Sequence, residues 1–321
     1  MHKLKTSDID LSIVIVTWNA KKYVEECLAS IVEQTGFGGV EVILVDNAST
    51  DGTPDLVQDE YPQVRLIRND RNLGFAAANN IGLRETTGEY IFLINSDVVV
   101  PKDCLVTLLN YMRQNPDIGL LGPQMRGTKG EVRRSTMRFP TVWNSFCHAV
   151  ALDAVFSRSK TWGGFLMHDF GHDRVTDVDV LNGWFWVTRR EAMEKVGLLD
   201  ERFFIYGEDI DWSYRYHQAG WRVVFFPGAA ALHYGGASSS NAPIRFYIEM
   251  QQANLQYWEK HSRPPAKFAY LACSWIHHVL RVVGYTAVYA VQRSKRAMAG
   301  YKVKRSVASI AWLSGLRREA R

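Results

Sequence analysis

The stretch Tyr90-Ile-Phe-Leu-Ile-Asn-Ser-Asp97 decides the fold class. Its apolar run is typical of a strand covered on both faces of a sheet, and the run ends near an acidic residue. A second run of this kind, Val42-Ile-Leu-Val-Asp46, also ends in an aspartate. In open α/β sheets, ligands bind beyond the carboxyl ends of the strands. Two such strand ends in one region therefore predict a nucleotide site at one edge of a sheet.

Strands and helices alternate on both sides of this stretch. We expect strands at 11–16, 40–45, 64–67, 90–94 and 118–121, and helices at 21–33, 54–59, 76–85 and 104–114. This alternation predicts an α/β fold with a mostly parallel sheet. Residues 127–177 are irregular and suggest a loop-rich insertion that serves as a lid or acceptor wall. A strand at 178–187, a helix at 211–219 and a strand at 222–226 follow.

The composition is that of an ordinary globular protein, but its charge is uneven. Hydrophobic residues make up 47% and charged residues 22% of the 321 residues, and this length suits one large domain or one domain with an appendage. Residues 260–321 hold 13 Lys and Arg and one acid, a net charge of +12 that leaves −7 on the rest. A basic tail on an acidic body predicts an anionic partner, either a membrane surface or a nucleic acid.

The cysteines and the start of the chain bear on the compartment. The four cysteines form no CxxC pair, which favours a reducing compartment and argues against a structural zinc. The polar residues 1–8 do not resemble a signal peptide. We therefore expect a cytoplasmic protein.

The run Phe268–Val291 is the longest apolar stretch of the tail. A spanning helix needs about 20 apolar residues, and Arg281 near the centre would cost roughly 2.5–3.5 kcal/mol on insertion. His277, Arg281 and Tyr285 can share one polar face, which favours an interfacial helix over a packed soluble helix or a spanning one. The tail's aromatic residues form no recognisable nucleic-acid module, so we expect a membrane surface and no nucleic acid as partner.

Seven motifs occur in a fixed order along the chain. They are Ser12-Ile-Val-Ile-Val-Thr-Trp-Asn19, Val45-Asp-Asn-Ala-Ser-Thr-Asp-Gly52, Asn72-Leu-Gly-Phe-Ala-Ala-Ala-Asn-Asn80, Asn95-Ser-Asp97, Gly197-Leu-Leu-Asp-Glu-Arg-Phe-Phe204, Gly207-Glu-Asp-Ile-Asp-Trp212 and His233. Between residues 11 and 257 the chain resembles the family 2 inverting glycosyltransferases with the GT-A fold. It is most similar to rhamnosyltransferase-like enzymes of bacterial surface polysaccharide assembly. The resemblance implies a GT-A domain over 1–259, with a nucleotide-binding half (11–123) and an acceptor half (124–259), followed by a basic helical tail (260–321).

The first three motifs carry the expected nucleotide pocket. Asp46 can accept a hydrogen bond from a pyrimidine N–H, as the matching aspartate does in the family, and Thr17 and Asn19 would line the same pocket. The alternative for Asp46 is a turn or cap residue. Asn72 and Gly74 resemble the family loop that passes under the ribose, where Gly74 allows close backbone approach. A simple turn before the next helix is the alternative.

The resemblance implies a divalent cation, Mn or Mg. Asp97 is the expected ligand and Ser96 lies in the same donor-binding motif. The family pattern is Asp-x-Asp, but the first position here is the neutral Asn95, which weakens the implied site. His233 would complete the metal shell, as in some family members, and imidazole suits manganese better than magnesium. The alternatives are that Asp97 caps a turn and that His233 is structural.

Asp209 is the expected catalytic base, because the family's base is the Asp of this Glu-Asp motif. A position at a helix N-terminus would favour its charged form, although a plain N-cap is the alternative. Glu208 would bind the acceptor or orient the site. Asn182 and Trp184 belong to the region that borders the sugars in the family, and a Trp ring can stack on a sugar face. Core packing is the alternative for Trp184, which alternation could place on one face with Trp186.

The sequence thus predicts an inverting transferase that moves a sugar, rhamnose from dTDP-rhamnose or another sugar on dTDP or UDP, to a glycan hydroxyl. The acceptor is expected to be lipid-linked, and the enzyme peripheral on the inner face of the cytoplasmic membrane. A sugar-nucleotide nucleotidyltransferase is one alternative, but it would need a Gly-rich loop after the first strand, and residues 17–22 contain no glycine. The other alternative is a catalytically weak carbohydrate-binding homologue, which the neutral Asn95 suggests.

Overall fold

The computed structural model describes residues 9–34, 39–235 and 243–315. The polar start of the chain and the last six residues of the basic tail therefore lie outside the described residues. The chain forms two compact units. Unit 1 comprises Met1–Phe139 and Gly171–Asn241, and unit 2 comprises Pro140–Phe170 and Ala242–Arg321.

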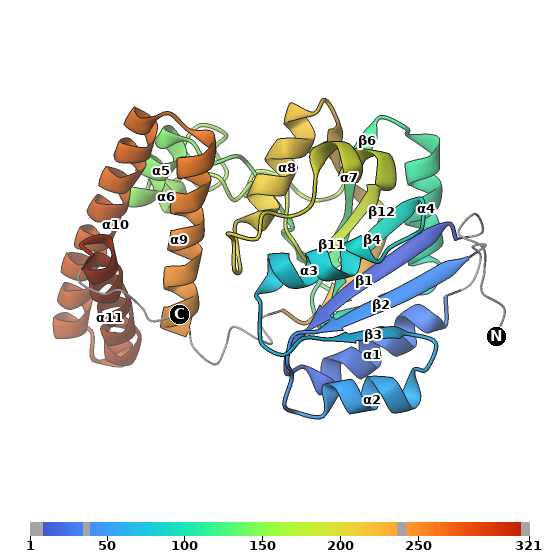
Figure 1. The fold of residues 1–321 in the computed structure, drawn as a ribbon. Coiled ribbons are helices and arrows are strands. Elements are labelled where there is room, and N and C mark those ends of the chain that lie inside the picture. Colours follow the sequence, from blue (N-terminus) through green and yellow to red (C-terminus); the bar gives the residue numbers. More distant parts are fainter. Residues whose placement is uncertain (1–8, 35–38, 236–242, 316–321) are drawn as a thin grey trace. The chain divides into compact units, whose positions relative to one another are not determined.

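Unit 1 is built on a large mixed sheet (Figure 1). Its strands follow the order β3-β2-β1-β4-β11-β6-β12-β5, with β7 paired to β6, β9 paired to β12, and a separate β10-β8 pair. The strands are β1 Leu11–Thr17, β2 Val40–Asp46, β3 Arg65–Arg68, β4 Tyr90–Asn95, β5 Val98–Val99, β6 Ile118–Arg126, β7 Val132–Arg133, β8 Thr136–Met137, β9 Thr176–Asp177, β10 Val180–Leu181, β11 Phe185–Arg189 and β12 Arg222–His233.

The first four long strands run parallel, as the alternating pattern predicts. β1 pairs in parallel with β2 and with β4, and β2 pairs in parallel with β3. β11 then enters antiparallel between β4 and β6. Buried apolar side chains fill β1, β2 and β4, because helices cover both faces of the sheet. The fold-class prediction of a mostly parallel sheet flanked by helices is confirmed.

The helices of unit 1 are α1 Lys21–Val32, α2 Thr53–Glu60, α3 Phe75–Arg84, α4 Cys104–Gln114, α7 Arg190–Val196 and α8 Glu208–Gln218. α1 and α4 pack on the sheet face that carries Ile13 and Ile15. α3 packs on the other face, where Ala78 joins Ile43 and Val45. Side chains along β1 and β2 alternate between the two faces of the sheet, so each strand contacts a helical layer on both faces.

One predicted strand is interrupted. Residues 178–187 divide into β10 and β11, because Asn182, Gly183 and Trp184 form a connection between them. α7 follows β11 directly and has no counterpart among the predicted elements. β12 extends seven residues past the predicted end at Phe226, and this extension carries it to His233. A break in its pairing register with β6 lies between Phe226 and Ala230.

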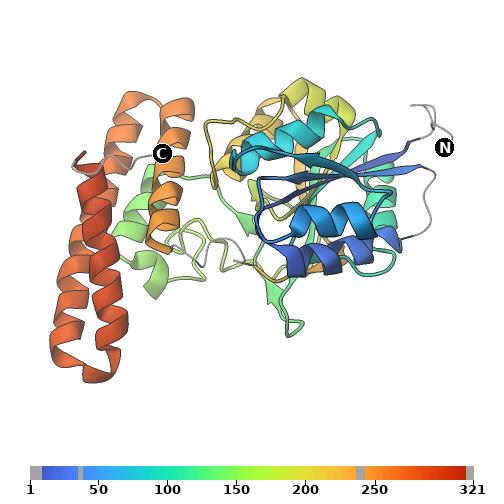
Figure 2. The ribbon, with the colours of Figure 1, turned by 60° about the horizontal axis from the view of Figure 1, so that its bottom comes forward.

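Unit 2 is helical (Figure 2). Its elements are α5 Val142–Ala149, α6 Leu152–Val155, α9 Pro243–His261, α10 Pro264–Val291, the short 3-10 turn η2 Arg293–Lys295 and α11 Arg296–Leu313. The prediction of a helical tail is confirmed, but the unit begins earlier than position 260, since that position lies inside α9. Part of the predicted insertion, residues 140–170, belongs to this unit because α5 packs against α10.

The predicted polar face of α10 lies inside unit 2. His277 is 7% exposed and its ring stacks on His148 of α5, with 4.6 Å between ring centroids. The apolar side chains of the helix are outside instead: Phe268 is 66% exposed and Val283 is 65% exposed. The polar groups find partners on neighbouring helices, which leaves the apolar face uncovered within this unit. Across the parts of the chain that the structure describes, no helix is both long and apolar enough to cross a membrane.

Candidate active site

The strand register brings the predicted nucleotide residues to one edge of the sheet. Thr17, the last residue of β1, pairs with Asp46, the last residue of β2. On the other side of β1, Val16 pairs with Asn95, the last residue of β4. Because these strands are parallel, their carboxyl ends open on the same side, where ligands bind in open α/β sheets.

Thr17 and Asp46 carry unpartnered polar atoms at this edge. The two residues are 1% and 2% exposed. Asp46 Oδ2 accepts a hydrogen bond of 3.0 Å from the Ser49 amide. Asp46 Oδ1 and Thr17 Oγ1 are buried without a hydrogen-bond partner. An unmade buried hydrogen bond costs about 1–3 kcal/mol, so two adjacent ones mark a place where a polar ligand would recover that cost.

Asn19 joins the loops that surround this edge. Its amide donates to Ser49 Oγ at 2.8 Å, and its Oδ1 accepts from the Thr50 amide at 2.8 Å. The residue has a φ of 49°, a left-handed conformation that Asn adopts more readily than most residues. The Asn19 side-chain oxygen therefore holds the loop that forms the wall of the pocket.

The loop that contains Asn72 and Gly74 is organised by Asn47, a residue that the sequence analysis did not single out. Asn47 Nδ2 donates to Asn72 Oδ1 at 2.8 Å and to the Gly74 carbonyl at 3.2 Å, while its Oδ1 accepts from the Leu73 amide at 2.9 Å. Gly74 has a φ of 85°, and a Cβ there would lie 2.4 Å from the Phe204 carbonyl oxygen. The only sequence signal for Asn47 is its place directly after Asp46 in the second motif.

The fold brings Asp97 and His233 together from 136 positions apart. β5 pairs antiparallel with the end of β12, with Val98 opposite His233. Asp97 Oδ1 lies 3.1 Å from His233 Nε2, and Asp97 Oδ2 accepts from the Gly235 amide at 3.1 Å. Ser96 lies in the turn between β4 and β5 and is half-buried.

These two side chains offer one carboxylate oxygen and one imidazole nitrogen to a cation. Within the described ranges, no group of three or more His, Cys, Asp or Glu could hold a metal ion. A divalent cation that binds diphosphate often takes only one or two protein ligands, with phosphate and water filling the other positions. The donor set therefore fits a cation shared with a phosphorylated ligand rather than a closed structural site.

Trp184 lies next to this pair, and the Trp184 amide donates to the Asn182 carbonyl at 2.9 Å. Trp184 is 3% exposed, and its ring stacks on the His233 ring with 5.5 Å between centroids. Because Trp184 precedes β11, its ring has different neighbours from Trp186, which contacts Trp212, so the two do not share one face. Core packing is thus what the structure shows for Trp184. Asn182 Oδ1 is buried without a hydrogen-bond partner.

Glu208 and Asp209 begin α8, as the sequence predicts, after Gly207 with a φ of 85°. Asp209 is half-buried and its Oδ1 accepts from the Ile210 amide at 2.9 Å. Burial raises the pKa of Asp209 to about 6, although backbone amides of Ile210, Gly183 and Gly207 oppose the shift. A carboxylate with a pKa just below neutral suits a general base.

Glu208 differs from its neighbour in burial. It is 5% exposed, and its Oε2 has no hydrogen-bond partner. Burial first, and the charge of Asp209 second, raise the pKa of Glu208 well above its usual range. Burial and the neighbouring charge thus favour the protonated form of Glu208 beside Asp209 with its pKa of about 6, an arrangement typical of sites that divide acid and base roles.

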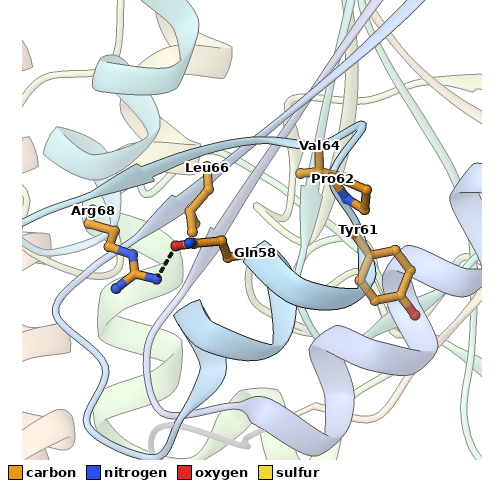
Figure 3. Close-up of a pocket in the computed structure, with 6 residues that line it drawn as sticks. All are labelled: Gln58, Tyr61, Pro62, Val64, Leu66 and Arg68. Atoms are coloured by element: carbon orange, nitrogen blue, oxygen red, sulfur yellow. Dashed lines mark hydrogen bonds between the residues drawn. The ribbon is translucent and has the colours of Figure 1, made fainter.

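A surface hollow elsewhere in unit 1 contains none of these residues. It lies along α2 and β3 and is lined by Gln58, Tyr61, Pro62, Val64, Leu66 and Arg68 (Figure 3). Arg68 donates to Gln58 Oε1 at 2.8 Å across its floor. We do not assign the chemistry to this hollow because it lacks the carboxylates.

The fold and this edge of the sheet define a GT-A glycosyltransferase. The model of glycosyl transferase family 2 matches residues 12–197, more than half of the chain, and the chain belongs to that family. It is an inverting enzyme that transfers a sugar from a nucleotide donor. Membership of this family excludes the alternative that the chain is a sugar-nucleotide nucleotidyltransferase.

Relatives and solved structures agree with this assignment. The chain is 33% identical over 244 residues to the N-acetylglucosaminyl-diphospho-decaprenol L-rhamnosyltransferase of Mycobacterium tuberculosis, covering 73% of this chain and 78% of the relative. The mannosyltransferase PcManGT from Pyrobaculum calidifontis, solved with GDP-Man and Mn2+, has a TM-score of 0.55 at 20% identity, covering 94% and 85% of the two chains. S. aureus TarS 1-349 with UDP has a TM-score of 0.53 at 14% identity, covering 98% and 93%.

Proposed function

We propose that this chain transfers L-rhamnose from dTDP-rhamnose to a hydroxyl of a lipid-linked, diphosphate-containing glycan acceptor. The observation that carries the proposal is the 33% identity, over about three quarters of the chain, to a rhamnosyltransferase whose named acceptor is a diphospho-decaprenol. UDP-sugars are the competing donors, since a pyrimidine N–H is common to both nucleotides.

The pyrimidine would satisfy the atoms that the protein leaves unpaired. The ring N–H donates to Asp46 Oδ1, and Thr17 Oγ1 pairs with a neighbouring group of the base; both protein atoms are otherwise buried and unpartnered. Asn19, Asn72 and Gly74 hold the loops around the nucleoside. Ser96 lies beside the diphosphate.

Asp97 and His233 would hold a divalent cation, which when bound neutralises negative charge on the departing nucleotide diphosphate. Their facing oxygen and nitrogen, 3.1 Å apart, support this assignment. Asn182, with its unpartnered Oδ1, and Glu208 would contact the sugars, and Trp184 stacks on the His233 ring.

Asp209 acts as the base. It removes the proton from the acceptor hydroxyl as that oxygen attacks the anomeric carbon, and the bond from that carbon to the diphosphate oxygen breaks with inversion. The reaction is a single displacement with no covalent enzyme intermediate. With a pKa of about 6, Asp209 is mostly ionised at neutral pH, although its burial raises this pKa.

A donor panel tests the proposed substrate. Purified protein would be incubated with manganese, a soluble GlcNAc-diphospho-lipid analogue, and either dTDP-rhamnose or UDP-sugars, and the glycosylated product would be measured by mass spectrometry. We expect product with dTDP-rhamnose, and about 10²–10⁴-fold less from the Asp209→Asn variant. Product formed only from a UDP-sugar would overturn the donor assignment.

The second part of the proposal is peripheral attachment to the cytoplasmic face of the membrane through α10. Trp275, Ile276, Val279 and Leu280 are 38–45% exposed, and they lie at helical spacing with Phe268 and Val283. An exposed apolar face of this kind, in a segment of net charge +12, is the pattern of an interfacial helix at an anionic surface.

Vesicle flotation tests this attachment. Val279→Ser with Val283→Ser should reduce flotation with anionic vesicles at low salt, whereas Val132→Ser, an equally exposed valine in unit 1, should not. Flotation that is equal for all three proteins would contradict the membrane role of α10.

A further inference from the structure

Three cationic side chains gather inside unit 2. Arg281 lies on α10, and Lys302 and Arg305 lie on α11, and we call them the basic cluster. All three are half-buried. Burial, followed by the charges of Arg305 and Arg281, lowers the pKa of Lys302. α10 and α11 pack against each other, which agrees with this mutual influence of the three cations.

Among the described residues, the basic cluster has no carboxylate as an ion-pair partner. In the described part of unit 2, none of its members forms an ion pair with a carboxylate, while Asp153 contacts His148 and Glu259 pairs with Lys267. The Arg281 guanidinium reaches only the His148 carbonyl, at 3.5 Å. Like charges held together without a partner destabilise a fold.

Arg305 also keeps a buried donor unused. Its guanidinium lies over the Tyr247 ring, with 4.0 Å between Cζ and the ring centroid, and its Nε is buried without a hydrogen-bond partner. The ring fixes the guanidinium by a cation–π contact but satisfies none of its N–H groups. A buried charged donor without an acceptor is costly, and an anionic ligand that accepts from it would recover that cost.

Histidines complete the surroundings of the basic cluster. His278 is 2% exposed; its Nε2 contacts Gln251 Oε1 at 2.7 Å, and its Nδ1 is buried without a partner. Burial, then the charges of Arg305 and Arg281, lower the pKa of His278 to about 4. Burial and the charge of His148 lower that of His277 to about 3. Both rings are neutral near pH 7, and an anion nearby would raise their pKa values.

We propose that the basic cluster of Arg281, Lys302 and Arg305 is a binding site for a phosphoryl group. A phosphate carries two negative charges or nearly so, and several acceptor oxygens, which match the uncompensated cations and the unused Arg305 donor. The inference rests on the proposed function for its natural ligand: the diphosphate of the lipid-linked acceptor. The donor residues lie in unit 1 and the basic cluster in unit 2, so the two can be tested separately.

Titration with inorganic pyrophosphate tests the site itself. Pyrophosphate would be added to the full-length protein, and its binding would be measured by calorimetry. A chelator in the buffer would prevent cation-dependent binding at the donor site. The pKa of the His278 ring would be measured by NMR. We expect pyrophosphate to bind and to raise the pKa of His278. Arg281→Gln and Lys302→Gln should each weaken binding about fivefold, the effect of roughly 1 kcal/mol per basic residue. Lys304→Gln, an exposed lysine on the same helix, should bind as the parent does.

Stability separates a ligand site from a structural cluster. Without pyrophosphate, Arg281→Gln and Lys302→Gln should unfold at the same temperature as the parent or higher, because each removes a repulsion. The proposal is overturned if pyrophosphate does not bind the parent, or if both variants bind it normally.

The source of the phosphoryl group follows from two further measurements on the same variants. A raised KM for the lipid-diphosphate acceptor, with unchanged donor hydrolysis, assigns the basic cluster to the acceptor. Weaker flotation with phosphatidylglycerol vesicles, with unchanged KM, assigns it to phospholipid headgroups, and no change in either assigns it to a free phosphate. Because pyrophosphate binding needs no glycosyl transfer, failure of the proposed function would leave this result intact.

Discussion

Replacing Asp209 by Asn should strongly reduce the transferase activity. It should also remove the acid limb of the pH profile, which is the fall of activity at acidic pH. The carboxylate of Asp209 is the group placed to take the acceptor proton, and general-base catalysis contributes about 10²–10⁴-fold. Asn keeps the side-chain shape, and its Oδ1 can still accept from the Ile210 amide, so the start of α8 should survive the change. Affinity for the nucleoside diphosphate should be nearly unaltered, since the proposed nucleoside contacts lie at β1 and β2.

The pKa of Asp209 gives the expected size of the fall in activity at acidic pH. With a pKa of about 6 for Asp209, about one tenth of the protein has the base ionised at pH 5, and about nine tenths at pH 7. The parent kcat/KM should therefore fall about tenfold from pH 7 to pH 5. The residual activity of Asp209→Asn should lack this dependence.

Glu208→Gln is the matched control. Burial, rather than Glu208, is the main cause of the raised pKa of Asp209, so the midpoint of the profile should stay near 6 in this variant. Initial rates from pH 5 to 8, at low concentrations of both substrates, would be compared for the three proteins. Near-normal turnover by Asp209→Asn, or loss of the acid limb in Glu208→Gln alone, would refute Asp209 as the base.

Four substitutions, Glu208→Gln among them, test the surroundings of the site. Glu208→Gln should raise the unfolding temperature at pH 8 but not at pH 4: the folded-state pKa of Glu208 is raised, so its ionisation costs stability above the ordinary value of 4.5, at about 1.4 kcal/mol per pKa unit. A thermal melt that shifts equally at both pH values would count against this. Asp97→Ala and His233→Ala should each weaken manganese-dependent binding of a nucleoside diphosphate by about tenfold or more, without changing binding in a chelator; calorimetry that finds no metal dependence in the parent would exclude the cation site. Gly74→Ala should cost about 1–3 kcal/mol of stability, because its conformation strains other residues and the new Cβ would meet the Phe204 carbonyl, so an unchanged denaturant midpoint would contradict that geometry.

The strand ends of unit 1 could be predicted from sequence because their signal is local. An apolar run such as Val42-Ile-Leu-Val-Asp46 reports burial on both faces, and parallel pairing then places its last residue beside those of its neighbours. Asn47 escaped this reasoning because an Asn after a strand resembles any turn residue. Its three hydrogen bonds reach residues 72–74, and only the folded chain shows them.

The helices of unit 2 have features that local sequence patterns do not predict. The period of α10 correctly predicts one apolar and one polar face, but periodicity does not tell which face is covered. Here the polar side packs inward because α5, about 130 residues earlier, supplies His148 as a partner for His277. The same long-range packing explains why residues 140–170 join unit 2.

The distribution of unsatisfied groups follows the same division. Four of the residues with such a group in unit 1 are proposed site residues: Thr17, Asp46, Asn182 and Glu208; the others among the described residues of that unit are Gln34, Ser135 and Trp221. In the described part of unit 2 the groups are His278 Nδ1 and Arg305 Nε, which belong to the surroundings of the basic cluster, and Trp258 Nε1. A ligand that pairs with such a group recovers a cost of about 1–3 kcal/mol. The two proposed sites share no residue and lie in different units, so a change in either should alter the binding constant of its own ligand alone, the nucleotide sugar in unit 1 or the phosphorylated ligand in unit 2.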